Sequence, residues 1–178
     1  MTLILGFAPF ILFSILSRLS ADLALWVSFA AAFVVTIRDF VERPALRLLD
    51  GASLTLFGLL ALGRGFLWPD LPLADVRAIL DLGLLLVIAF SLLRRRPFSA
   101  QYASGETHGR VWPLPAFLRV NYVISFAWAA AFAAMALADG AVALLPVPLV
   151  VGVAVSAIAL AAAITLSLVY PARMASKL

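Results

Sequence analysis

The stretch "VRAILDLGLLLVIAFSLLRRR", residues 76–96, decides the fold class. From Leu82 to Leu93 it holds no charged residue, and three arginines follow at once. About 20 helical residues cross the roughly 30 Å hydrocarbon core of a bilayer, and the cytoplasmic ends of such helices are rich in arginine. The stretch therefore predicts a helix that crosses a membrane and ends at its cytoplasmic surface.

The composition of the whole chain agrees with a lipid environment. Of 178 residues, 65% are hydrophobic and 12% are charged, whereas a soluble domain has about 25% charged and about 45–50% apolar residues. The chain has no cysteine, which excludes disulfides, a thiol nucleophile and thiolate metal ligands. One histidine alone disfavours a zinc site. We expect no metal, no cofactor and, because the basic residues lie between apolar segments, no nucleic-acid partner.

Apolar segments recur along the chain and predict its architecture. We place them at residues 3–17, 22–37, 48–67, 76–93, 119–138 and 148–170. Each should be helical, because lipid cannot satisfy exposed backbone groups. The fold class is therefore all-α: a polytopic transmembrane helix bundle with about six membrane-spanning helices in one domain, 1–178. The first two segments are short, so five crossings with a partial hairpin is the alternative.

The basic residues predict the orientation of this bundle. If all six segments cross, ten lysines and arginines share a side with the N-terminus, and three lie on the other side. Cytoplasmic loops carry the excess of basic residues, so both termini should be cytoplasmic (N-in/C-in). The main cytoplasmic loop is then 94–118. The outer loops 68–75 and 139–148 contain acids and prolines but no bases.

Asp81 is the most informative single residue, because it lies about one turn inside the fourth segment. A carboxylate at that depth costs a few kcal/mol unless it is paired or hydrated. Arg77 is four residues earlier on the same helical face, and Arg64 should lie at a similar depth. We expect Asp81 to pair with Arg64, Arg77 or both. With no second acid deep in another segment, a structural pair is favoured over a proton or ion step.

Two further polar residues begin predicted helices. Asp50 starts the third segment, where an acid can cap the first amides and interact favourably with the helix dipole. Asn121 starts the fifth segment, where its amide can hydrogen-bond to a neighbouring helix or contact a substrate. Small residues at four-residue spacing, such as Gly152 and Ser156, fit close helix packing within a bundle or in a homo-oligomer.

The polar stretch after the fourth segment is the candidate surface for partners. Its arginines are explained by topology and would also attract anionic lipid headgroups, by roughly 1 kcal/mol for each basic residue. Aromatic residues in the same loop are suited to lying on the membrane surface. The predicted surface for headgroups, or for a membrane or cytoplasmic protein partner, consists of Arg94, Arg95, Arg96, Phe98, Tyr102 and Trp112.

Three phrases carry a resemblance to a known family. They are "FAPFILFSI" (7–15), "GASLTLFGLLAL" (51–62) and "FLRVNYVISFAWAAAFAAMA" (117–136). In this order they resemble the small bacterial inner-membrane proteins grouped around intracellular septation protein A and related uncharacterised families. The Lys-Pro-Thr phrase of that family is absent, and "RRRPFSAQYA" (94–103) stands nearby, which leaves a sister family open. The resemblance implies a multi-pass protein of the bacterial inner membrane.

The sequence favours a non-enzymatic interaction or scaffold component, and the resemblance implies that it acts in cell-envelope upkeep or division. A small oligomeric transporter or channel, with Asp81, Arg64 and Asn121 near its path, is the alternative. A membrane enzyme that acts on lipid ranks third, because no strong catalytic candidate lies at headgroup depth.

Overall fold

The computed structural model describes residues 2–42, 47–106 and 115–175. Within these ranges the chain is helical between short turns and has no strand. The helices are α1 (Thr2–Gly6), α2 (Ala8–Leu16), α3 (Ala21–Glu42), α4 (Leu48–Leu62) with the π-helical turn η1 (Gly63–Leu67), α5 (Leu73–Leu93), α6 (Phe98–Glu106), α7 (Pro115–Leu144) and α8 (Leu149–Ala175).

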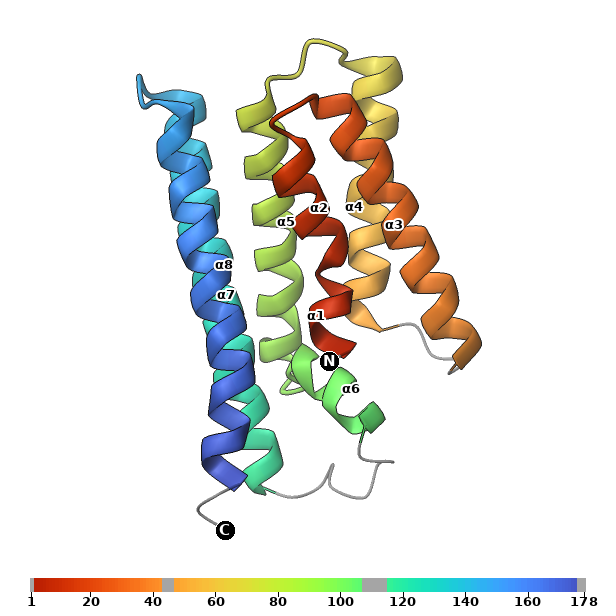
Figure 1. Cartoon of the computed structure of the whole chain (residues 1–178), viewed down its shortest axis with the longest axis vertical. Coiled ribbons are helices and arrows are strands. Elements are labelled where there is room, and N and C mark those ends of the chain that lie inside the picture. Colours follow the sequence, from red (N-terminus) through yellow and green to blue (C-terminus); the bar gives the residue numbers. More distant parts are fainter. Residues whose placement is uncertain (1, 43–46, 107–114, 176–178) are drawn as a thin grey trace.

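The helices form one bundle whose long elements run roughly side by side (Figure 1). α7 and α8 pair along one side and α3 and α4 along the other, while α5 and the N-terminal segment (α1 and α2) lie between these pairs. α1 begins, and α8 ends, at the end of the bundle where α6 lies. We call this the inner end and the opposite one the outer end.

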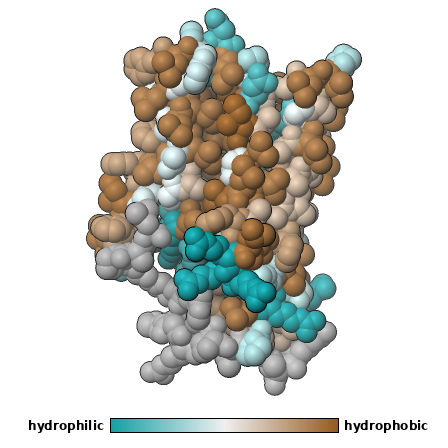
Figure 2. All heavy atoms as spheres, turned by 180° about the vertical axis from the view of Figure 1, so that it is seen from behind, coloured by the Kyte–Doolittle hydropathy of each residue, from teal (hydrophilic) through white to brown (hydrophobic). Residues whose placement is uncertain are grey.

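The lengths and surface of the helices define the class of protein. Among the described residues, five helices are long and apolar enough to cross a membrane: α3, α4 with η1, α5, α7 and α8. Large apolar side chains are exposed along these helices, and Figure 2 shows apolar side chains over most of one face, with hydrophilic ones gathered mainly toward the inner end. The chain is therefore an all-helical bundle of the multi-pass membrane type.

The N-terminal segment is not one continuous helix. α1 and α2 are separated at Phe7, and Pro9 lies in the first turn of α2. Proline has no N–H to donate and its ring clashes with the preceding turn, so the helix is interrupted before it. The described part, about 15 residues, would extend about 22 Å at 1.5 Å per residue, which is less than the hydrocarbon thickness.

Three predicted boundaries near the ends of the bundle are corrected by the structure. α7 continues past residue 138 to Leu144, because glycine at Gly140 is tolerated in a helix and the breaker, Pro146, comes later. α8 likewise continues beyond residue 170 to Ala175. In the predicted loop 94–118, residues 98–106 form a helix, α6.

Aromatic side chains fill the core between the two ends of the bundle. The Phe7 ring stacks on Trp128 with centroids 3.7 Å apart, and Phe10 packs against Phe57 at 4.8 Å. Phe132 contacts both Phe7 and Phe10. Tilted aromatic pairs such as Phe10 and Phe57 add to the stabilisation that burial itself gives. The N-terminal segment is thus held by a buried aromatic layer.

Candidate functional site

The most unusual feature of the bundle is a group of polar side chains buried between three apolar helices. Arg77 on α5 donates from Nε to Asp139 Oδ2 on α7 at 3.0 Å, and from Nη2 to Ser156 Oγ on α8 at 2.8 Å. Asp81, one turn after Arg77, is buried beside the same group and lines a cavity together with Arg77 and Ser156. These four residues, which we call the outer cluster, are between 0 and 6% exposed.

The outer cluster lies well inside the helices that supply it. Arg77 is four residues and Asp81 eight residues from the start of α5, which places them about 6 and 12 Å along the helix from its outer end. Asp139 is five residues before the end of α7. Buried ionisable groups at this depth cost free energy and mark ion paths, proton relays or ligand sites in many membrane proteins.

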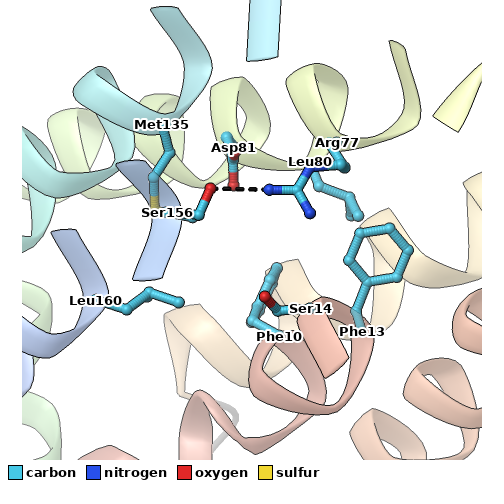
Figure 3. A pocket seen from close by; sticks show the side chains of 9 residues that line it. All are labelled: Phe10, Phe13, Ser14, Arg77, Leu80, Asp81, Met135, Ser156 and Leu160. Atoms are coloured by element: carbon cyan, nitrogen blue, oxygen red, sulfur yellow. Dashed lines mark hydrogen bonds between the residues drawn. The ribbon is translucent and has the colours of Figure 1, made fainter. Parts of the chain in front are cut away.

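A small cavity lies beside the outer cluster (Figure 3). Its volume is about 20 Å³, which is enough for about one water molecule. Its polar wall contains Arg77, Asp81, Ser156 and Ser14, and Figure 3 shows the first three pointing toward one another. Its apolar wall is formed by Phe10, Phe13, Leu80, Met135 and Leu160. The N-terminal segment therefore closes one side of the cluster.

Gly152 makes room for the ionic side chain on the neighbouring helix. A Cβ atom at this position would lie 2.3 Å from Asp139 Oδ1, far inside van der Waals contact. Ser156, one turn later, donates to Gly152 O at 2.9 Å while it accepts from Arg77. The small-residue face that the sequence indicated is thus used within the bundle, where it lets α8 approach the outer cluster.

We expect Gly152→Ala to lower the free energy of unfolding by about 1–3 kcal/mol, the usual cost of overpacking. Asp139 cannot yield freely, because Arg77 holds its other carboxylate oxygen. Gly140→Ala is the matched control, since a Cβ there meets nothing within 4 Å and alanine is the better helix former. Thermal unfolding in detergent or nanodiscs measures both variants, and equal stability of the two would contradict the close approach.

A second polar group holds α6 against the inner end. Tyr102 donates to Asp50 Oδ1 at 2.8 Å, and the Arg47 guanidinium lies 4.6 Å above the Tyr102 ring while it also pairs with Asp39. Gly6 approaches the ring so closely that a Cβ there would be 3.1 Å from it. Burial, and then the neighbouring Asp50 carboxyl, raise the pKa of the Tyr102 phenol above its ordinary value.

The role predicted for Asp50 is corrected by this arrangement. The N-terminus of α4 has Arg47 at the cap position and no side-chain cap. Instead the Leu48 amide donates to Gln101 Oε1 of α6 at 2.9 Å. Asp50, which is the third residue of the helix, accepts from Tyr102. Docking of α6 therefore supplies the acceptor that a capping carboxylate would otherwise give.

Tyr102→Phe should make the protein less sensitive to alkaline pH. Because the folded state holds the phenolic proton more tightly than the unfolded chain, the free energy of unfolding falls as the pH rises above the ordinary phenol pKa of about 10. The variant has no phenol to titrate, so its free energy of unfolding should decline less steeply above about pH 10. It should also lose about 1–3 kcal/mol at neutral pH, because Asp50 Oδ1 loses its donor. Parallel alkaline slopes for variant and wild type would contradict the prediction.

Asn121 belongs to a third group that fixes α6 to α7. Ser99 Oγ lies 2.9 Å from both Asn121 O and Asn121 Oδ1 and 3.1 Å from Ser125 Oγ. Asn121 Nδ2 donates back to Phe117 O. Asn121 is 18 residues before Asp139 on the same helix, about 27 Å away along its axis. It is therefore a helix-packing residue at the inner end, far from the outer cluster.

The other predicted site residues are distributed as follows. Arg64 does not join Asp81: its Nε donates to Asp22 Oδ1 at 2.6 Å and its Nη1 to Leu71 O. Arg94, Arg95 and Arg96 are exposed where α5 ends. Trp112 lies outside the described residues.

The prediction that Phe98 and Tyr102 lie on the membrane surface is wrong. Both side chains are buried, at 0 and 1% exposure. α6 packs against α7 and α1, and its aromatic residues meet Phe7 and each other. A short helix at the inner end thus buries the aromatic face that the sequence assigned to the surface.

Asp139 and Ser156 are the site residues that sequence reasoning missed. Asp139 is the first residue of the predicted outer loop 139–148. The available signal was the apolar stretch from Ala141 to Leu145, which precedes the helix breaker Pro146. A segment extended to that proline places Asp139 inside the helix.

Comparison of the chain with protein-family models, characterised proteins and solved structures finds no match. The functional argument therefore rests on the geometry of the chain itself, and membership of the septation protein family stays a prediction.

Proposed function

We propose that this chain is a small ion-translocating protein of the bacterial inner membrane, with the outer cluster as its ion-handling site. The observation that carries the proposal is a pair of buried carboxyl groups, one ion-paired with a single guanidinium and the other lining the cavity beside it, between apolar helices. A single buried acid favoured a structural ion pair, since one carboxyl makes a poor relay. Asp139 supplies the second acid and removes that reason.

The energetics of buried charges support a functional reading of the outer cluster. Buried ion pairs are often no more stabilising than well-packed apolar residues of similar volume. We therefore expect the bundle to be no less stable if leucine or methionine replaced all three of Arg77, Asp81 and Asp139 together. Ionisable groups at such positions are the usual components of ion and proton paths.

We further propose six crossings with both termini on the cytoplasmic side. In support, the N-terminal segment and the five long helices alternate in direction between the two ends (Figure 1). The exposed Arg94, Arg95 and Arg96 lie at the inner end, as expected for a cytoplasmic surface. Accessibility of single cysteines introduced at Ser20 and Lys177 to an impermeant reagent tests this orientation.

Flux into proteoliposomes tests the proposed function. Liposomes with the purified chain should take up protons or Na⁺, each followed with an entrapped dye, faster than protein-free liposomes under an imposed membrane potential. Asp81→Asn and Asp139→Asn should reduce this flux to the protein-free level. Asp22→Asn, which removes a carboxylate at the outer surface, should keep it. Wild-type flux equal to that of empty liposomes, or full flux in Asp81→Asn, would refute the proposal.

An interaction component in cell-envelope upkeep or division is the second candidate. It is favoured by the three exposed arginines that follow α5, of which Arg95 has a left-handed backbone (φ 54°) that turns the chain toward α6. Arg94 lies over the Phe90 ring at 4.9 Å. This surface fits anionic lipid headgroups or an acidic protein partner, and both a partner and a homo-oligomer remain proposals.

Crosslinking from native membranes tests this second candidate. A partner captured by the wild type and lost from the Arg94→Gln/Arg95→Gln/Arg96→Gln variant would support it. A partner that binds both proteins equally, or no partner at all, would argue against a role for the arginines.

A further inference from the structure

We propose that the outer cluster binds one proton, shared between the Asp81 and Asp139 carboxyl groups. That this proton is the translocated ion rests on the function proposed above, whereas its binding in the cluster follows from geometry and charge.

The first argument is the balance of charge in the outer cluster. The charged groups of the cluster besides Asp81 are Arg77 from α5, which lines the same cavity, and Asp139 from α7, which pairs with Arg77. α8 contributes the hydroxyl of Ser156, and α2 contributes Ser14 and apolar side chains. Two carboxylates and one guanidinium leave one negative charge uncompensated in a buried site, and an isolated buried carboxylate is very costly. One bound proton makes the cluster neutral.

The second argument is the hydrogen bonding of Asp139. Its Oδ2 accepts a hydrogen bond from Arg77. Its Oδ1 is buried and has no hydrogen-bond donor among the described residues. Asp81 is the second buried carboxyl of the cluster, since it lines the cavity beside Arg77, which in turn holds Asp139. An ionised carboxyl has no hydrogen to donate, so a hydrogen bond between two carboxyl groups exists only when one of them carries a proton. That proton is the missing donor.

The third argument is the size and lining of the cavity beside Asp81. About 20 Å³ admits a single water molecule, but no organic substrate. Hard metal cations need a shell of oxygen ligands, and most of the cavity wall is apolar, with Phe10, Phe13 and Leu160 among its residues. A proton needs no such shell. The site therefore fits a proton, with one water as its exchange partner, better than it fits a metal ion.

The position of the cluster indicates from which side the proton exchanges. Toward the inner end it is followed by the aromatic layer in which Phe7 stacks on Trp128 and Phe10 packs on Phe57. Toward the outer end the first turns of α5 and α8 and the last turns of α7 lie between the cluster and the helix ends. In this conformation the shared proton should exchange with the outer side.

Infrared spectroscopy of the full chain in nanodiscs tests the shared proton directly. At neutral pH the wild type should show the carbonyl stretch of a protonated carboxyl, shifted when H₂O is replaced by D₂O. Asp81→Asn and Asp139→Asn should each abolish this band, because either change leaves one carboxylate paired with Arg77 and no need for a proton. Asp50→Asn removes a buried carboxyl outside the cluster and should keep the band.

The outcomes separate this inference from the proposed function. Absence of the band in the wild type overturns the proton site, and this outcome does not depend on whether the variants fold. A band that survives in Asp139→Asn shows that the proton is not shared between the two carboxyl groups. A band that behaves as expected in a protein without ion flux supports the site and refutes translocation. If flux depends on Asp81 but the wild type shows no such band, ion translocation is supported and the bound proton is refuted.

Discussion

Replacing Arg77 with methionine should lower the free energy of unfolding by about 3–5 kcal/mol, the cost of leaving a buried charge without its partner. Methionine keeps much of the volume of the side chain but donates to neither Asp139 nor Ser156, both of which accept from the guanidinium. Unfolding in lipid nanodiscs, followed by loss of helicity, measures the change. It should be among the largest effects of any single polar substitution in the chain.

Two further variants show whether this loss comes from charge. The double variant Arg77→Met/Asp139→Leu should recover most of the lost stability, because removing both members of a buried ion pair is often neutral. Arg64→Met breaks the pair with Asp22, whose carboxylate side chain is 60% exposed, and should cost under about 1 kcal/mol. A double variant no more stable than Arg77→Met would show that shape, and not charge, explains the loss.

Phe7→Ala should be comparably damaging and should open the cavity at the outer cluster. The Phe7 ring is buried, stacks on Trp128 and contacts Phe98 and Phe132. Truncation of such a ring costs about 3–5 kcal/mol. Because Phe7 anchors the N-terminal segment, α2 should then separate more often from α5 and α8, and the cavity wall at Ser14 should become accessible.

A thiol reporter measures this opening separately from stability. The chain has no cysteine, so Ser14→Cys gives one thiol beside the cavity. Its rate of labelling by a small maleimide should rise in Phe7→Ala. Phe33→Ala is the control, since that ring is 49% exposed on the outside of the bundle, and it should change neither stability nor labelling appreciably. Equal labelling with and without Phe7 would show that this ring does not hold the segment in place.

The sequence predicts the class of this protein well, because the thickness of a bilayer fixes how long an apolar run must be. The segments expected at 22–37, 48–67, 76–93, 119–138 and 148–170 each overlap one of the five long helices, and the all-helical class is confirmed. The first segment shows the limit of the method. Its apolar content predicts a helix. Whether Pro9 interrupts that helix depends on which side chains pack beside the break at Phe7.

The outer cluster was predictable in part. The depth of Asp81 and its spacing from Arg77 follow from one helix, and the two residues line the same cavity, but among the described residues Arg77 forms its ion pair with Asp139 and not with Asp81. Asp139 approaches only because α5 and α7 are neighbours, and neighbour relations between helices leave no trace in a single sequence. The same reason explains the error at α6, whose burial depends on a gap at Gly6 and an acceptor at Asp50.

The broken N-terminal segment has a consequence for biosynthesis. Phe7 stacks on Trp128, which follows it by 121 positions in the sequence. The cavity that α2 closes on one side is also lined by Ser156 and Leu160 of α8. During translation this segment can pack early against α3 and α4, but its contacts with α7 and α8 form only after nearly all of the chain has left the ribosome. The polar cluster is completed only in the last stage of assembly, so a chain stalled before α7 would leave Arg77 without either of its acceptors, Asp139 and Ser156.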